Sequence, residues 1–129
     1  MLEDNVSDLV NKTLTKCERH KLNGRDYIIF ETDSGEEYKM YHSQSCCEDV
    51  HIEDITGVLS DLVGYPLINA REDTNNSLGL ASDPISSIQE EWTFYNFATI
   101  KGYVTIRWYG SSNGYYSTSV DFKKENKKE

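Results

Sequence analysis

The chain of 129 residues is 37% hydrophobic and 27% charged, and it contains nine Tyr, four Phe and two Trp. This many large aromatic side chains can form one modest core, which excludes an intrinsically disordered protein. With 13 Lys and Arg against 22 Asp and Glu, the formal net charge is −9. Because such a body repels phosphate backbones and anionic lipids, we expect no direct nucleic-acid binding and no membrane association.

The pattern of apolar residues and cysteines limits the class of protein further. No stretch approaches the roughly 18 apolar residues of a membrane span, and Met1–Asp4 lacks the basic and apolar regions of a secretory signal. Three cysteines, two of them adjacent, do not make a disulfide framework. We therefore expect a single domain over residues 1–122 in the cytoplasm, followed by a flexible Lys/Glu tail over residues 123–129.

The N-terminal part of the chain predicts a helix followed by a meander. Apolar residues recur at helical intervals over residues 4–14, which predicts a short N-terminal helix. Asn23-Gly24 and Asp33-Ser34-Gly35 are turn signals between β-rich runs. They predict an antiparallel meander of three strands, at about residues 15–22, at Tyr27–Phe30 and at Glu37–Tyr41.

The middle of the chain predicts a strand, a helix and a loop. Asp49–Asp54 alternates between apolar and polar residues and indicates a further strand. Ile55–Gly64 has one apolar helical stripe and ends at a glycine, which predicts a second helix. Pro66–Ala70 returns as a strand, and the Asn-, Ser- and Asp-rich residues 72–90 predict a long surface loop.

The last part of the chain predicts a β-hairpin of Tyr103–Tyr109 and Tyr115–Phe122. Directly opposed residues share a face, so matching Ile106 with Val120 aligns the two apolar faces around a turn at Ser112-Asn113-Gly114. The inward face then carries Val104, Ile106 and Trp108. The expected fold class is α+β, with an antiparallel sheet of about six to eight strands, one short N-terminal helix and one helix near residues 55–64.

The outward face of this hairpin is the first candidate binding site. Tyr and Arg dominate binding hot spots because they combine large contact area with polar ends, and a guanidinium can bind carboxylate or phosphate in bidentate fashion. In the alternative interpretation, Arg107 pairs with Asp121 and the tyrosines pack against the rest of the fold. The candidate partner- or ligand-binding residues are Tyr103, Arg107, Tyr109, Tyr115 and the turn residue Asn113.

A second candidate site is the segment His42–His51, which concentrates nucleophilic and metal-binding side chains. Adjacent cysteines on an extended chain point to opposite faces, so we expect no zinc site. Cys46 or Cys47 could act as a catalytic thiol with His42 or His51 as base, although free cysteines more often behave as small buried hydrophobes. Nearby carboxylates could bind Mg²⁺ or act as acid and base, or form a solvated edge; these are Glu48, Asp49, Glu53, Asp54 and Asp61.

Several segments together carry a resemblance to a known family. They are residues 38–55 with Cys46-Cys47-Glu48, Trp92–Tyr95, and residues 102–117 with Ser112-Asn113-Gly114-Tyr115-Tyr116. Over roughly residues 25–122 the chain is similar to a family of small tailed-bacteriophage proteins with no assigned activity. The resemblance implies a phage accessory protein that is made inside a bacterium and acts on host machinery, and it implies no catalytic residue.

Three functions remain open. The first is a non-enzymatic binding protein that blocks a bacterial host or anti-phage defence factor in the cytoplasm of the infected cell, where an acidic surface competes for a basic groove. The second is sequestration of a small nucleotide signal by the Tyr/Arg face. The third is a small cysteine-dependent enzyme. We expect no metal and no cofactor, and exposed strand edges make a homodimer conceivable.

Overall fold

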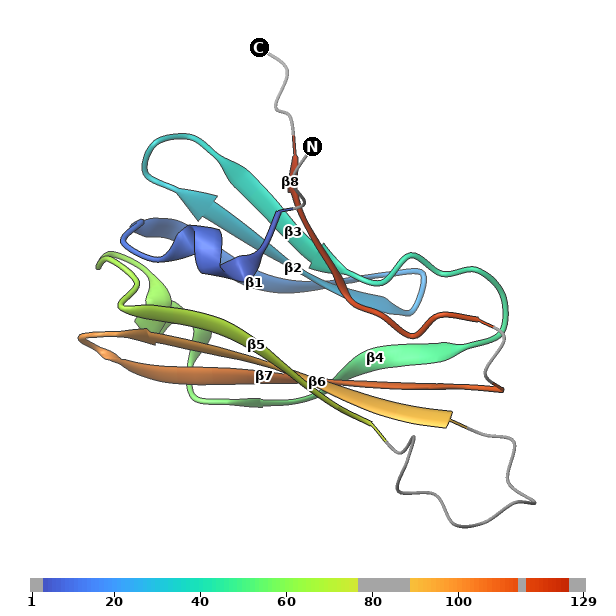
Figure 1. Cartoon of the computed structure of the whole chain (residues 1–129). Helices are drawn as coiled ribbons and strands as arrows, with labels where there is room; N and C mark the ends of the chain where they lie inside the picture. Colours follow the sequence, from blue (N-terminus) through green and yellow to red (C-terminus); the bar gives the residue numbers. More distant parts are fainter. Residues whose placement is uncertain (1–3, 77–88, 114–115, 126–129) are drawn as a thin grey trace.

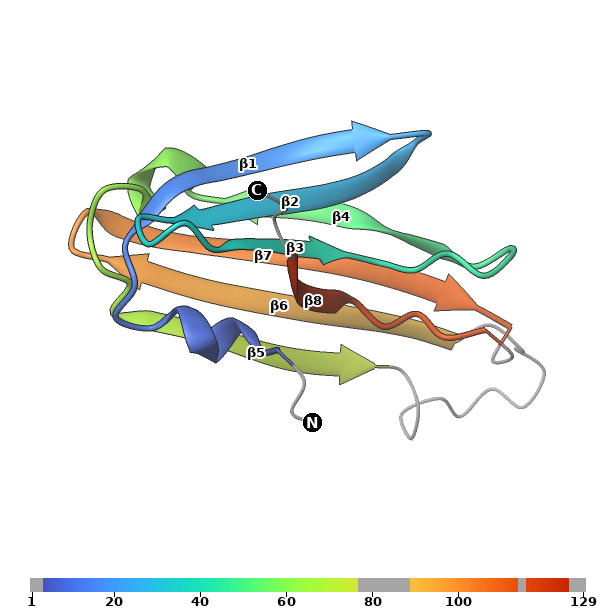
Figure 2. The ribbon, with the colours of Figure 1, turned by 90° about the horizontal axis from the view of Figure 1, so that it is seen from above.

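The computed structural model describes residues 4–76, 89–113 and 116–125, which form two facing antiparallel sheets (Figure 1). The first sheet has the strand order β1-β2-β3-β8 and the second has the order β4-β7-β6-β5. Seen from above, the strands of the two layers run in similar directions (Figure 2), as in an aligned β-sandwich. No helix in these ranges is long and apolar enough to cross a membrane.

The first sheet confirms the predicted three-stranded meander. The turn between its first two strands places Asn23 and Gly24 at φ angles of 53° and 78°, the left-handed conformation that a two-residue hairpin turn requires. The fourth strand comes from the end of the chain and lies beside β3, with Met40 opposite Phe122. The strands are β1 (Leu14–Leu22), β2 (Arg25–Thr32), β3 (Glu37–Tyr41) and β8 (Asp121–Glu125).

The second sheet is built around β7, which pairs with β4 on one side and β6 on the other. The strand predicted at Asp49–Asp54 is confirmed as part of β4. The loop predicted over residues 72–90 is wrong at both ends, because β5 continues to Asn76 and β6 begins at Gln89; residues 77–88 lie outside the described residues. The strands are β4 (Asp49–Thr56), β5 (Asn69–Asn76), β6 (Gln89–Thr99) and β7 (Gly102–Ser112).

The predicted antiparallel sheet architecture is confirmed, with eight strands. The helical content is lower than the α+β prediction expected. The two predicted helices are single 3-10 turns, η1 (Val6–Leu9) and η2 (Leu59–Leu62), and the described ranges contain no α-helix. At the position of the second predicted helix, β4 already includes Ile55. The residues that remain after β4 lie between Gly57 and Gly64, which have φ angles of 95° and 96°. An α-helix does not contain such positive φ angles, so only one short turn fits between the two glycines.

The core lies between the two sheets and confirms the predicted inward face of β7. Val104, Ile106 and Trp108 are buried. The indole Nε1 of Trp108 lies 3.3 Å from the Met40 sulfur in the opposite sheet, which satisfies its N–H donor in an apolar setting. Other buried side chains from both layers complete the core, including Leu14, Ile28, Phe30, Ile52, Tyr95, Phe97 and Phe122.

The predicted C-terminal hairpin is wrong in its pairing. Ile106 lies opposite Ile55 and Tyr95, not opposite Val120. After β7 the chain crosses to the first sheet, and it passes so close to Gly110 that a Cβ there would lie 2.7 Å from the Thr118 Cβ. Residues 123–125, predicted as the start of a flexible tail, belong instead to β8; residues 126–129 lie outside the described residues.

Candidate interaction face on the second sheet

Alternation along β7 turns its polar side chains away from the core. Tyr103 is 75% exposed and the Arg107 side chain is 40% exposed, while their neighbours Val104 and Ile106 are buried. Tyr109 shares this outward face with them, as the sequence predicts. Successive side chains of a strand alternate between the two sides of a sheet, so the buried apolar set determines where the Tyr and Arg side chains lie.

Three rings from neighbouring strands form a row across this face, which we name the aromatic row: His51 of β4, Tyr109 of β7 and Trp92 of β6. Tyr109 is directly opposite both partners in the strand pairing. Its ring centroid lies 5.5 Å from that of His51 and 5.4 Å from that of Trp92, within the range of attractive aromatic contacts. His51 and Trp92 are not among the residues predicted for this face, because only the pairing of β7 with β4 and β6 brings them together with Tyr109.

Carboxylates hold the polar ends of this face. Arg107 Nε forms an ion pair with Glu53 Oε1 at 3.0 Å, and Trp92 Nε1 donates to the same oxygen at 3.1 Å. The Tyr109 hydroxyl donates to Glu90 Oε2 at 2.7 Å, and this hydrogen bond to a carboxylate raises the pKa of Tyr109. These contacts fix the orientation of the rings.

The alternative pairing of Arg107 with Asp121 is wrong, since Glu53 is the partner. Asp121 belongs to β8 in the other sheet, where it accepts a hydrogen bond from the Ser43 hydroxyl at 3.1 Å. Of the remaining candidates, Asn113 is exposed just beyond the end of β7, and Tyr115 lies outside the described residues. Tyr103, Arg107 and Tyr109 are therefore the predicted residues that the structure brings together.

The second candidate segment is organised around the buried pair His42 and Glu48. Their side chains meet at 2.7 Å between His42 Nε2 and Glu48 Oε2, and His42 Nδ1 lies 2.6 Å from the carbonyl oxygen of Ser119. A carbonyl oxygen can only accept, so the Nδ1–H of His42 is the donor to Ser119, and the Glu48 carboxyl group engages Nε2. The backbone N–H of Ser45, with those of neighbouring residues and the His42 ring, lowers the pKa of Glu48 to about 2, against the effect of burial.

This arrangement does not support a thiol nucleophile with His42 as its base. Cys46 and Cys47 are exposed and joined by a disulfide, so the expectation that their side chains point to opposite faces is wrong. Both nitrogens of His42 are already engaged, by Glu48 and by the Ser119 carbonyl. The geometry that activates a cysteine, a base within hydrogen-bond reach of the sulfur, is not formed by these residues.

The acidic residues of the same region have separate structural partners. Glu48 binds His42 and Glu53 binds Arg107, while Asp49 lies 3.0 Å from the His51 ring. Asp54, in β4, accepts a hydrogen bond from the Thr56 hydroxyl at 3.4 Å. Within the described ranges, no group of three or more His, Cys, Asp or Glu side chains converges on a point where a metal ion could be held.

Comparison with known proteins adds one finding. Residues 7–122 match the model of a family described as Domain of unknown function (DUF7448). No curated protein and no solved structure matches the chain. Because the family match spans nearly all of both sheets, the chain belongs to the family of Domain of unknown function (DUF7448).

Proposed function

We propose that this chain is a non-enzymatic binding protein that inhibits a bacterial host or defence protein by covering the functional surface of that protein. The observation that carries the proposal is the aromatic row, which lies on the outer face of the second sheet across three adjacent strands. Two of its rings, Trp92 and Tyr109, are held by the Glu53 and Glu90 carboxylates. A face that is already ordered loses little conformational entropy when a partner binds.

The composition of this face suits a protein partner. Trp, Tyr and Arg are the residue types that contribute most to binding hot spots, and Trp92, Tyr109 and Arg107 occupy neighbouring positions on β6 and β7. A strongly exposed Tyr103 extends the same face along β7. The contact would bury the rings at its centre, with the surrounding carboxylates at its rim.

The charge of the chain indicates what kind of surface the partner presents. The net charge is −9, and Asp49, Glu53 and Glu90 lie around the aromatic row. A basic groove that normally holds nucleic acid is complementary to such a face, and electrostatic attraction would speed the encounter. The proposed partner is therefore a basic, nucleic-acid-handling protein.

The cellular setting in this proposal rests on the resemblance to tailed-bacteriophage proteins. That resemblance suggests that the chain acts in the cytoplasm of an infected bacterium, on a host or anti-phage factor. The two other functions receive less support from the geometry. Nucleotide binding by Arg107 would require phosphate to displace Glu53, and cysteine catalysis would require His42 to leave Glu48 and the Ser119 carbonyl.

Affinity capture from a bacterial lysate, followed by mass spectrometry, tests the proposal. The double variant Trp92→Ala/Tyr109→Ala removes two members of the aromatic row, and Tyr65→Ala, which removes an exposed ring outside the row, is the control. We expect the parent chain and the control to capture the same basic protein and the double variant to lose it. Binding of that purified partner should weaken steeply with added salt.

Two outcomes would contradict this function. One is capture of the same partner by the double variant at an undiminished level, which would remove the aromatic row from the contact. The other is an affinity that does not change with salt, which would remove charge complementarity from the recognition.

A further inference from the structure

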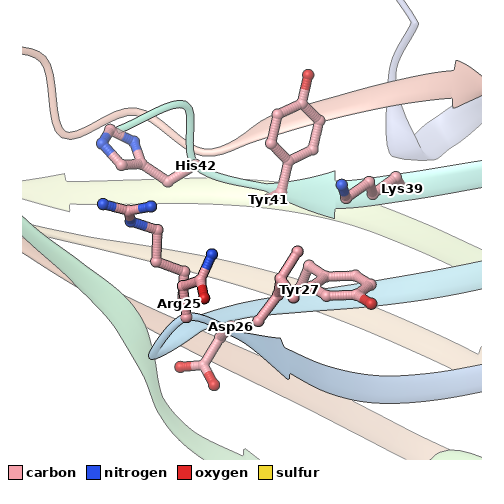
Figure 3. A pocket seen from close by; sticks show the side chains of 8 residues that line it. Arg25, Asp26, Tyr27, Lys39, Tyr41 and His42 are labelled. Carbon is pink, nitrogen blue, oxygen red and sulfur yellow. The ribbon is translucent and has the colours of Figure 1, made fainter. Parts of the chain in front are cut away.

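A small pocket opens on the first sheet, on the side of the sandwich away from the aromatic row. It has a volume of about 130 Å³ and lies where the turn between β1 and β2 meets the end of β3. Figure 3 shows the residues that line it, with Arg25 on the His42 side and Lys39 on the side of the two tyrosine rings. The lining side chains that the argument uses are Arg25, Asp26, Tyr27, Lys39, Tyr41 and His42.

The positive charges of this pocket are unusual for so acidic a chain. Most Lys and Arg residues of the described ranges form ion pairs with carboxylates. Arg25 and Lys39 have no carboxylate partner among the residues that the structure describes. Lys123, directly opposite Lys39 in the pairing of β3 with β8, has none there either. A chain with 22 acidic residues thus leaves two cations that line one pocket without a carboxylate partner in the described ranges, as it also leaves Lys101 in the turn between β6 and β7.

The acidic groups near the pocket do not cancel this charge. The Asp26 carboxylate is buried beneath the sheet, where it contacts Arg19 at 3.3 Å and accepts the Ile52 N–H at 2.8 Å. Figure 3 shows it pointing away from His42 and Tyr41. The Glu48 carboxylate is paired with His42. Among the residues that line the pocket, the cations of Arg25 and Lys39 are therefore the charges that no carboxylate partner balances.

Two tyrosine rings hold one of these cations, Lys39, in place. The Lys39 ammonium lies 4.8 Å from the centroid of the Tyr27 ring and 5.0 Å from that of Tyr41, so it sits between two cation–π contacts. His20 stacks on Tyr27 at 5.2 Å between ring centroids and supports that ring from the side of β1. A point charge is thus held in the same pocket as a guanidinium that can bind an oxyanion with two hydrogen bonds.

We propose that this pocket binds the phosphate group of a small phosphorylated molecule. A dianionic phosphate matches one guanidinium and one ammonium in charge. The volume is well below the roughly 300 Å³ of a pocket that encloses a whole drug-sized ligand, so it accommodates the anionic group and leaves the remainder of the molecule on the surface. A nucleic-acid strand is disfavoured because the net charge of −9 repels a long phosphate backbone.

Titration of the isotope-labelled chain by NMR tests this site, with inorganic phosphate, adenosine monophosphate and adenosine as the probes at matched ionic strength. We expect saturable shifts of the Arg25, Tyr27, Lys39 and Tyr41 amides with both phosphate-containing probes and none with adenosine. Tighter binding of adenosine monophosphate than of phosphate would identify a phosphate ester as the ligand class, and equal binding would identify free phosphate.

Variants separate a specific site from general attraction of anions. Arg25→Ala and Lys39→Ala should each weaken binding by about tenfold or more. Lys101→Ala, which removes a cation from the turn between β6 and β7, should leave it unchanged. Equal weakening by all three variants, binding of adenosine alone, or no saturable shift in the millimolar range would each overturn the proposal. The site is independent of the aromatic row, so its failure would leave the proposed protein contact standing.

Discussion

The carboxylate of Asp26 in β2 accepts a hydrogen bond from the backbone N–H of Ile52 in β4, at 2.8 Å, and thereby joins the two sheets. β4 is an edge strand of the second sheet, so one side of its backbone lacks a strand partner. Asp26 supplies an acceptor there, and it is only 5% exposed. Arg19 balances the buried charge at 3.3 Å. A side chain of one sheet therefore completes the backbone hydrogen bonding of the other.

The first prediction concerns this link. Asp26→Ala should lower the free energy of unfolding by about 1–3 kcal/mol, because it leaves the buried Ile52 N–H without an acceptor. Urea denaturation measures the change. The exposed turn residue Asp33 provides the control, since Asp33→Ala removes the same charge without a buried hydrogen bond. Equal losses in the two variants would show that the effect comes from net charge and not from the link.

The second prediction is a dependence of stability on pH that originates at Glu48. Its folded pKa of about 2 lies below the ordinary value of 4.5, so the folded chain releases this proton more readily than the unfolded chain. The stabilisation is therefore fully present above pH 4.5 and is lost as the pH falls toward 2. Unfolding of the parent chain and of Glu48→Gln, measured across this range, should differ most at the upper end and converge at the lower end. A constant difference would contradict this origin.

The third prediction separates the two faces of β7. Ile106 is fully buried and Tyr103 is 75% exposed, although three positions separate them in one strand. Ile106→Ala should lower the free energy of unfolding by about 2–5 kcal/mol through the cavity that it leaves. Tyr103→Ala should change it by about 0.5 kcal/mol or less. Chemical denaturation of both variants tests the orientation, and a larger loss in Tyr103→Ala would mean that the strand faces the other way.

The fourth prediction concerns the reactivity of the three cysteines. Burial raises the pKa of the Cys17 thiol to about 12, so little of the reactive thiolate forms at about pH 8. Iodoacetamide should leave the folded, unreduced chain unlabelled, because Cys46 and Cys47 form a disulfide. After reduction of the folded chain, mass spectrometry should find the label on Cys46 and Cys47 but not on Cys17. Cys17 should become labelled only when the chain is unfolded. Labelling of Cys17 in the folded chain would contradict its burial.

Local sequence patterns were sufficient where neighbouring elements in the chain are also neighbours in space. The meander of β1, β2 and β3 follows from β-rich runs separated by turn residues, and Asn23-Gly24 adopts the left-handed conformation that its sequence favours. The helix predicted at Ile55–Gly64 failed because β4 continues through Ile55. An apolar spacing of three and four does not reveal how many residues a preceding strand will take.

The C-terminal strand shows why pairing could not be inferred. Apolar and polar residues alternate over Tyr115–Phe122, and this pattern is compatible with any partner strand that has an apolar face. Pairing with β3, where Met40 lies opposite Phe122, buries the apolar face as well as pairing with β7 would. Gly110 has no side chain, and the chain uses this close passage beside Thr118 to reach the other sheet. The sequence contained that glycine, but nothing local indicated what would approach it.

By itself, the sequence determined the antiparallel β architecture, the inward side of β7 and the outward Tyr103, Arg107 and Tyr109, because alternation and turn preferences act between residues close in the chain. Only the tertiary structure decided the division into two sheets, the aromatic row, the partner of Arg107 and the cationic pocket. Each of these depends on which distant strands become neighbours, and that choice is made by the packing of the whole core rather than by any single segment.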